Sequence, residues 1–144
     1  MSKMQVLIVE DNEQVRQDLR TLLALAGDVD VVGEANDGQE AIRQVKALQP
    51  DTVVMDLEMP VMDGYEATRQ IKALSPACRV IALTVHAYET ARQKAAQAGV
   101  DAFIVKGVSV GTLLQAISAI EYPNKEKKNG KSNDTSWLDK RDAR

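Results

Sequence analysis

The chain has 144 residues, of which 44% are apolar and 27% charged, a length and composition that suit one globular domain and exclude two. Residues 1–121 are acidic, with 11 Lys and Arg against 17 Asp and Glu, so they are poor partners for duplex nucleic acid. A single cysteine, Cys78, excludes an intramolecular disulfide, and a single histidine, His86, excludes Ser/His/Asp or Cys/His catalysis unless it is itself the base.

Five short apolar runs alternate with amphipathic segments along the chain. The runs are rich in β-branched residues and too short for helices, which predicts buried strands at 5–9, 30–35, 52–55, 80–83 and 102–105. Between them, apolar residues recur with a period near 3.6, which predicts five helices, carrying in turn Val15, Leu19, Leu22, Leu23 and Ala26; Ala41, Ile42, Val45 and Leu48; Ile71 and Leu74; Ala91, Ala95 and Ala98; and Val110, Leu113, Leu114, Ile117 and Ile120. This alternation predicts an α/β fold, a doubly wound parallel sheet with helices on both faces. The second strand is the most polar and therefore suits an edge.

Local signals mark where the helices begin and end. Asn12 is placed to cap the first helix, and Asp37 with Glu40 resembles a capping box for the second. Pro50 separates the second helix from the third strand, and Gly99 stands where a helix end needs a left-handed residue.

The composition changes abruptly after the last predicted helix. Residues 122–144 carry seven Lys and Arg against four Asp and Glu and are almost free of apolar side chains, which is typical of a solvated linker or disordered tail. We therefore expect one domain over residues 4–121 followed by a polar basic tail. The sequence has neither the layout of a signal peptide nor a stretch of transmembrane length, so we expect a cytoplasmic protein that does not engage a membrane.

Chemically active side chains follow four of the predicted strands. Glu10 and Asp11 come after the first, Asp56 after the third, Thr84 after the fourth and Lys106 after the fifth. Because the carboxyl ends of parallel strands share one edge of the sheet, we expect these side chains to converge there.

Three converging carboxylates need a cation. Two like charges 4 Å apart repel by about 1 kcal/mol in water and about 4 kcal/mol at an effective dielectric constant of 20. Lys106 alone cannot neutralise three acids, whereas Mg²⁺ prefers oxygen ligands and keeps sites free for phosphate oxygens. Mg²⁺, Lys106 and Thr84 around the Asp56 carboxylate suit phosphoryl transfer to that carboxylate.

Four stretches of the sequence together resemble a known family. VLIVED at 6–11, VVMDLEMPVMDGYEA at 53–67, VIALTVHA at 80–87 and AGVDAFIVKG at 98–107 are similar, in order and spacing, to the receiver domains of two-component response regulators. The resemblance covers about residues 4–120 and is most specific from Asp56 to Gly64. It is greatest to the branch of the family that is joined to C-terminal helix-turn-helix domains.

The resemblance implies a role for each residue of the site. Asp56 would be the phosphoacceptor, with Glu10, Asp11 and the backbone carbonyl of Glu58 helping to hold Mg²⁺. Lys106 would contact the phosphoryl group, while Thr84 and Phe103 would be the switch residues. The strand order would be 2-1-3-4-5, in a flavodoxin-like fold, and the phosphodonor would be a histidine kinase or a phosphotransfer protein.

The sequence also departs from the common family pattern. Glu10 stands where aspartate is more usual, and Val85 stands where a small residue is common. Glu58 and His86 lie two residues after Asp56 and Thr84, and we hypothesise that this pair and Val85 set the lifetime of the acyl phosphate. The alternative for His86 is an ordinary surface position. Phe103 also suits a core position, and a core position does not exclude a switch role.

Two other functions fit the sequence less well. A phosphatase or phosphotransferase with an aspartyl-phosphate intermediate would need a second acid or base, but Leu57 and Glu58 follow Asp56 where such phosphatases have Asp-x-Asp. A nucleotide-binding module would need a glycine-rich turn after the first strand, where this chain has Glu10, Asp11 and Asn12.

The output of the domain stays open at this point. The chain is either the regulatory part of a transcription factor or a stand-alone receiver in a phosphorelay, acting on a downstream protein. We expect no direct nucleic-acid binding by residues 1–144. Phosphorylation-dependent homodimerisation through the fourth and fifth helices is an analogy with the family alone.

Overall fold

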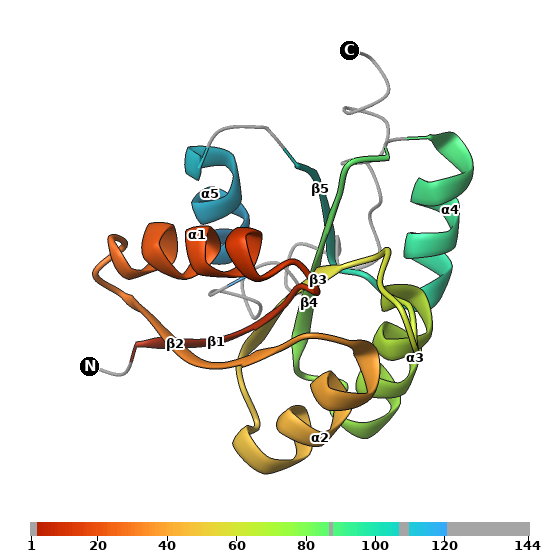
Figure 1. The fold of residues 1–144 in the computed structure, drawn as a ribbon, viewed down its shortest axis with the longest axis horizontal. Coiled ribbons are helices and arrows are strands. Elements are labelled where there is room, and N and C mark those ends of the chain that lie inside the picture. The colour runs from red at the N-terminus through yellow and green to blue at the C-terminus, as the bar shows by residue number, and fades with distance from the viewer. Residues whose placement is uncertain (1–2, 87, 107–109, 121–144) are drawn as a thin grey trace, which may run out of the picture.

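The computed structural model describes residues 3–86, 88–106 and 110–120, and shows five strands alternating with five helices (Figure 1). In chain order the elements are β1 (Met4–Val9), α1 (Glu13–Ala24), β2 (Val29–Ala35), α2 (Gly38–Leu48), β3 (Thr52–Asp56), α3 (Gly64–Leu74), β4 (Arg79–Thr84), α4 (Glu89–Ala98), β5 (Ala102–Val105) and α5 (Val110–Ile120). Every predicted strand and helix is present.

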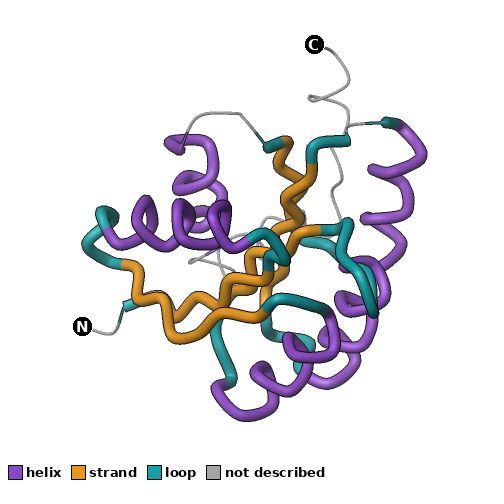
Figure 2. The backbone as a smooth tube through the Cα atoms, in the orientation of Figure 1, coloured by secondary structure: helices purple, strands orange, loops and turns teal. Residues whose placement is uncertain are grey.

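The strands form one parallel sheet in the order β2-β1-β3-β4-β5, which confirms both the fold class and the strand order. Figure 2 shows the sheet between two groups of helices, with α1 and α5 on one face and α2, α3 and α4 on the other. Each face has its own apolar core: Val6 and Ile8 of β1 belong to the core on the α1 side, whereas Leu7 and Val9 belong to the opposite one. As predicted, β2 lies at an edge.

The helix ends largely follow the predicted signals. The Asn12 side chain accepts a hydrogen bond from the Val15 amide at 3.0 Å. The Asp37 side chain accepts a hydrogen bond from the Glu40 amide at 2.8 Å, as in a capping box. The Glu40 carboxylate, however, accepts from the amide of Asn36, one residue before the Asp37 amide that a capping box would use. Gly99 ends α4 with φ of 100°, as predicted.

Two apolar residues at the ends of predicted helices are not buried. Leu48 and Leu74 are 38% and 51% exposed, and each is the last residue of its helix. The third and fourth strands also run one residue further than predicted. Asp56 pairs with Leu83, and Thr84 pairs with Val105, so both functional candidates are the final residues of strands.

The β2 strand contains a bulge that matters for the site. Val6 pairs with Val31 but Leu7 pairs with Gly33, so Val32 is an extra residue in β2. The two sides of a strand alternate residue by residue, and an inserted residue exchanges them. As a result Glu34 pairs with Ile8, on the side of the sheet that α1 covers.

The predicted tail, residues 122–144, lies outside the described residues. Within the part of the chain that is described, every helix is too short or too polar to cross a lipid bilayer.

Candidate functional site

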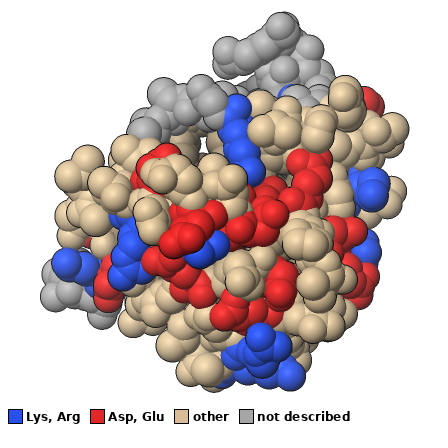
Figure 3. Space-filling model, in the orientation of Figure 1, with Lys and Arg blue, Asp and Glu red and all other residues tan. Residues whose placement is uncertain are grey.

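The three predicted acids lie together at the carboxyl ends of β1 and β3. Oxygen atoms of Glu10, Asp11 and Asp56 are all within 4.8 Å of one another. Glu10 is 1% and Asp56 3% exposed, whereas Asp11 faces solvent. β1 and β3 are neighbours in the sheet, so residues far apart in the sequence become adjacent. Figure 3 shows acidic side chains gathered across the middle of the molecule in this orientation.

Lys106 reaches the acids from the end of β5. Its ammonium nitrogen lies 2.9 Å from Glu10 Oε1 and 3.6 Å from Asp56 Oδ1. The Lys106 amide donates to the Thr84 carbonyl at 2.7 Å, which continues the pairing of β5 with β4 beyond Val105. Burial works to lower the pKa of Lys106, but the Glu10 and Asp56 carboxylates outweigh burial and raise the pKa above its usual value. Lys106 is therefore a firmly charged group.

Burial raises the pKa of the Asp56 carboxyl from 3.8 to about 7. The Glu58 amide and the Lys106 charge oppose this rise, whereas the Glu10 charge and a hydrogen bond with Asp11 add to it. Without a further positive charge, the protein therefore holds Asp56 partly protonated near neutral pH. A protonated carboxyl is a poor nucleophile, so the site is incomplete for chemistry at Asp56 until a cation joins it.

The donor set fits Mg²⁺. Three carboxylates within reach of one ion offer hard oxygen ligands, and neither a cysteine nor a histidine stands among them. Asp11 is exposed, so a hydrated ion would reach its carboxylate directly from solvent. A bound divalent cation would favour the charged carboxylate of Asp56 and would therefore lower its raised pKa.

Thr84 and His86 meet Glu58 beside Asp56. The Glu58 amide donates to Asp56 Oδ1 at 3.1 Å, while its carboxylate accepts from the Thr84 hydroxyl at 3.1 Å. His86 Nδ1 lies 2.6 Å from the other Glu58 oxygen, and the His86 amide donates to Thr84 Oγ1 at 3.1 Å. Tyr88 stacks on the His86 ring at a centroid distance of 5.5 Å. The Thr84 hydroxyl is thus bound to Glu58 and not to Asp56.

Phe103 is 1% exposed and belongs to the core on the side of α2, α3 and α4. The guanidinium of Arg92, on α4, lies 5.1 Å from the centre of its ring. In this arrangement Phe103 fills the core, as one of its two interpretations expects.

The loop after Asp56 is held close to the strand. The Gly64 amide donates to the Leu57 carbonyl at 3.0 Å, and a Cβ atom at Gly64 would lie 2.3 Å from the Asp56 carbonyl oxygen. Asp63 caps α3 by accepting from the Glu66 amide at 2.9 Å. Val61 has φ of 72°, a conformation that a β-branched residue rarely adopts. Such backbone strain is typical of functional loops.

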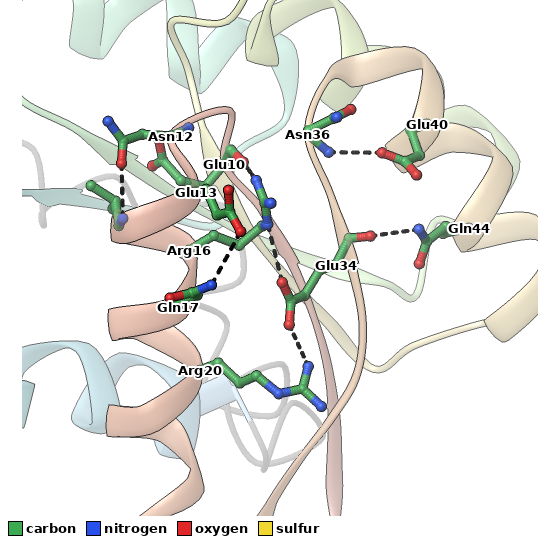
Figure 4. A network of polar contacts seen from close by, with 11 residues as sticks. Glu10, Asn12, Glu13, Arg16, Gln17, Arg20, Glu34, Asn36, Glu40 and Gln44 are labelled. Atoms are coloured by element: carbon green, nitrogen blue, oxygen red, sulfur yellow. Dashed lines mark hydrogen bonds and ion pairs between the residues drawn. The ribbon is translucent and has the colours of Figure 1, made fainter.

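Sequence reasoning missed Arg16, which lies beside the acids. Figure 4 shows its guanidinium between the carbonyl of Glu10 and the carboxylate of Glu34. Sequence spacing gives no signal for this contact, because it joins α1 to a strand that only the fold brings near.

Comparison with known proteins identifies relatives over most of the chain. Residues 6–118 match the family described as the response regulator receiver domain. The response regulator protein VraR of Staphylococcus saprophyticus is 40% identical over 112 residues, which cover 78% of this chain and 54% of VraR. The nitrate/nitrite response regulator protein NarL of Escherichia coli K12 is 30% identical over 112 residues, 78% of this chain and 52% of NarL. The chain thus spans about half the length of these curated relatives.

Solved structures agree with the sequence matches. A two-component response regulator of the LuxR family from Aurantimonas sp. SI85-9A1 superimposes with a TM-score of 0.79 at 37% identity, over 83% of this chain and 85% of that one. The signal receiver domain of the putative response regulator NarL from Mycobacterium tuberculosis gives a TM-score of 0.80 at 28% identity, over 85% of this chain and 99% of that one.

Proposed function

The chain belongs to the response regulator receiver domains of two-component systems, and from this we propose that it accepts a phosphoryl group on Asp56 in a reaction that needs Mg²⁺. The observation that carries the proposal is the approach of Lys106 to both Glu10 and Asp56 in a pocket where three carboxylates lie within 4.8 Å. Such a pocket suits a group that is itself anionic and that arrives with a cation.

The chain's own groups account for the transfer. An Asp56 carboxylate oxygen attacks phosphorus, the bond from phosphorus to the donor atom breaks, and the donor keeps the electron pair. Lys106 stabilises the negative charge on the transferred oxygens, and the Glu58 amide holds Asp56 Oδ1 at 3.1 Å in a fixed orientation. Asp11, Asp56, Glu10 and the Glu58 carbonyl would hold Mg²⁺, which supplies positive charge to the carboxylate and the phosphoryl oxygens. The domain thereby promotes its own phosphorylation and is not a multiple-turnover enzyme.

The switch begins at Thr84. Its hydroxyl donates to Glu58 in the structure described, and a phosphoryl group on Asp56 would offer a stronger, charged acceptor. Moving the hydroxyl toward that acceptor would release Glu58 and His86 and alter the loop between β4 and α4. Phe103 is already buried, so the proposed change at Phe103 is a repacking within the core next to α4.

The partners follow from the family. The phosphodonor would be a histidine kinase or a phosphotransfer protein. VraR and NarL are about twice as long as the matched region, which supports a fused output domain that regulates transcription. A stand-alone receiver that acts on a separate protein is the alternative, and the reading frame after Arg144 distinguishes the two. Phosphorylation-dependent homodimerisation remains a proposal by analogy.

Incubation with acetyl phosphate and MgCl₂, followed by intact mass spectrometry, tests the proposal. We expect one added phosphoryl group on the unmodified sequence, and none with EDTA or in Asp56→Asn. Asp51→Asn is the matched control, because Asp51 is an exposed carboxylate just before the opposite end of the same strand. Equal phosphorylation of Asp56→Asn would overturn the proposal.

A further inference from the structure

Arg16, in the first turns of α1, joins the acidic site to the edge of the sheet (Figure 4). Its Nη1 donates to the Glu10 carbonyl oxygen at 2.8 Å, and its Nε donates to Glu34 Oε1 at 3.0 Å. The Arg16 side chain is only 17% exposed, so solvent screens these contacts weakly. One guanidinium thus links α1, β2 and the residue that follows β1.

The Glu10 carbonyl belongs to the peptide unit that connects Glu10 with Asp11. A peptide unit is planar, so a partner that holds its oxygen restrains both flanking Cα atoms. β1 ends at Val9, and the Glu10 amide still donates to the Ala35 carbonyl at 3.0 Å, but the carbonyl of Glu10 points toward α1. Arg16 gives this carbonyl its partner and holds the plane from which both carboxylates project.

The guanidinium is itself held in place. Glu34 accepts from both Arg16 and Arg20, and the Glu34 carbonyl accepts from Gln44 Nε2 at 2.6 Å, which fixes the residue between α1 and α2. The bulge in β2 puts the Glu34 carboxylate on the α1 side of the sheet. Without that extra residue, the carboxylate would face α2 and would not meet Arg16.

We propose that Arg16, anchored by Glu34, is a positioning residue that presents Glu10 and Asp11 to the divalent cation. The inference rests on the proposed function, because it concerns the cation that phosphorylation of Asp56 requires. Arg16 touches neither the cation nor the phosphoryl group, and acts only through the Glu10–Asp11 peptide.

Lysine cannot replace arginine here. The planar guanidinium directs two separate N–H groups at two acceptors that lie on different elements, whereas an ammonium is a point charge on a flexible stem. Arg16→Lys retains the charge near Glu34 but loses the geometry, so it separates positioning from simple electrostatics. Groups that hold metal ligands typically change metal affinity by about 10- to 100-fold when removed.

The test is the Mg²⁺ dissociation constant, obtained from amide chemical shifts during titration of the full chain with MgCl₂. We expect Arg16→Ala and Arg16→Lys to bind Mg²⁺ about tenfold more weakly. Arg20→Ala is the matched control, because Arg20 also pairs with Glu34 but is 51% exposed. The Mg²⁺ dissociation constant of this variant should be within about twofold of that of the unmodified chain. Arg16→Lys serves as the second variant if Arg16→Ala folds poorly.

A second control separates positioning from loss of stability. Lys72 binds the Cys78 carbonyl and Asp101, which precede β4 and β5 and so lie at the amino ends of the strands, away from the acidic site. Lys72→Ala should therefore weaken the fold without changing the site. We expect its Mg²⁺ affinity to be unchanged. At saturating MgCl₂, both Arg16 variants should reach the normal extent of phosphorylation by acetyl phosphate, because every group that meets the phosphoryl group is retained.

The possible failures are distinct. Normal Mg²⁺ affinity in both Arg16 variants would overturn the positioning role and leave the proposed function intact. Equal weakening in Lys72→Ala would reduce Arg16 to a general stabilising residue. Absence of Mg²⁺ binding by the unmodified chain would overturn both the inference and the magnesium requirement of the proposed function.

Discussion

The buried carboxyl of Asp56 should make the cation-free protein less stable as the pH rises. Its pKa is about 7 in the folded protein against 3.8 for an exposed aspartate, so the folded state keeps a proton that the unfolded state loses at lower pH. By linkage, stability falls across the window between these two values and the loss is complete above the folded pKa. Asp56→Asn removes this group and should therefore be most stabilising at alkaline pH.

The size of this effect on the free energy of unfolding follows from the two pKa values of Asp56. A rise from 3.8 to about 7 corresponds to about 4 kcal/mol, at about 1.4 kcal/mol for each pKa unit. Lys106 and entering water relax the site as it ionises, so we expect Asp56→Asn to gain at least about 2 kcal/mol over the unmodified chain at pH 8. The gain should be small at pH 4, because Asp56 is protonated in the folded state and still partly protonated in the unfolded state.

Urea unfolding followed by circular dichroism, in EDTA at several pH values from 4 to 8, measures this difference. Asp51→Asn is the control, because Asp51 is exposed and water screens its charge. Addition of MgCl₂ at pH 8 should stabilise the unmodified chain and reduce the advantage of Asp56→Asn. A gain that is the same at pH 4 and pH 8, or a loss of stability at pH 8, would refute the reasoning.

Five further substitutions test other parts of the structure. Lys106→Met leaves the buried Glu10 carboxylate, which lies 2.9 Å from the ammonium, without its cation, and we expect a loss of about 3 kcal/mol in urea unfolding with EDTA; unchanged stability would show that this ion pair does not support the fold. Gly64→Ala places a Cβ 2.3 Å from the Asp56 carbonyl, so it should lower stability by about 3 kcal/mol and slow phosphorylation, and a normal urea midpoint would argue against the close approach. Val61→Asn should raise stability by about 1 kcal/mol, because asparagine tolerates the φ of 72°, and a lower urea midpoint would contradict this strain. Val85→Ala and His86→Ala should each shorten the lifetime of the phosphorylated protein by about fivefold, or about 1 kcal/mol, since Val85 directly follows Thr84 and His86 Nδ1 lies 2.6 Å from Glu58, whose amide binds Asp56. Decay at the normal rate in both variants, followed by intact mass after removal of acetyl phosphate, would rule out this role.

Much of the fold was predictable because its signals are local. A run such as residues 5–9 is mostly apolar, rich in β-branched residues and too short for a helix, which together favour a buried strand. The same logic located Asp56, Thr84 and Lys106, since parallel strands bring their carboxyl ends to one edge. Asn12 and Gly99 marked helix ends because their side-chain and backbone chemistry is specific to those positions.

Other features depend on tertiary contacts that no local pattern encodes. The attachment of the Thr84 hydroxyl to Glu58, and of Glu58 to His86, requires two loops to meet across 26 and 28 residues. The Arg16–Glu34 pair depends on a bulge in β2. Polar and apolar residues do not alternate regularly in this strand, so the sequence gives no sign of the extra residue. Exposure of Leu48 and Leu74 reflects where the helices end, which is the least certain part of any periodic pattern.

The most direct measurement locates the phosphoryl group itself. After incubation with acetyl phosphate and MgCl₂, borohydride reduces an aspartyl phosphate to homoserine, and tandem mass spectrometry of peptides identifies the converted residue. We predict conversion at Asp56 alone, dependent on MgCl₂. Conversion at Glu10 or Asp11, or phosphate retained on His86 while Asp56 stays unchanged, would contradict the central claim.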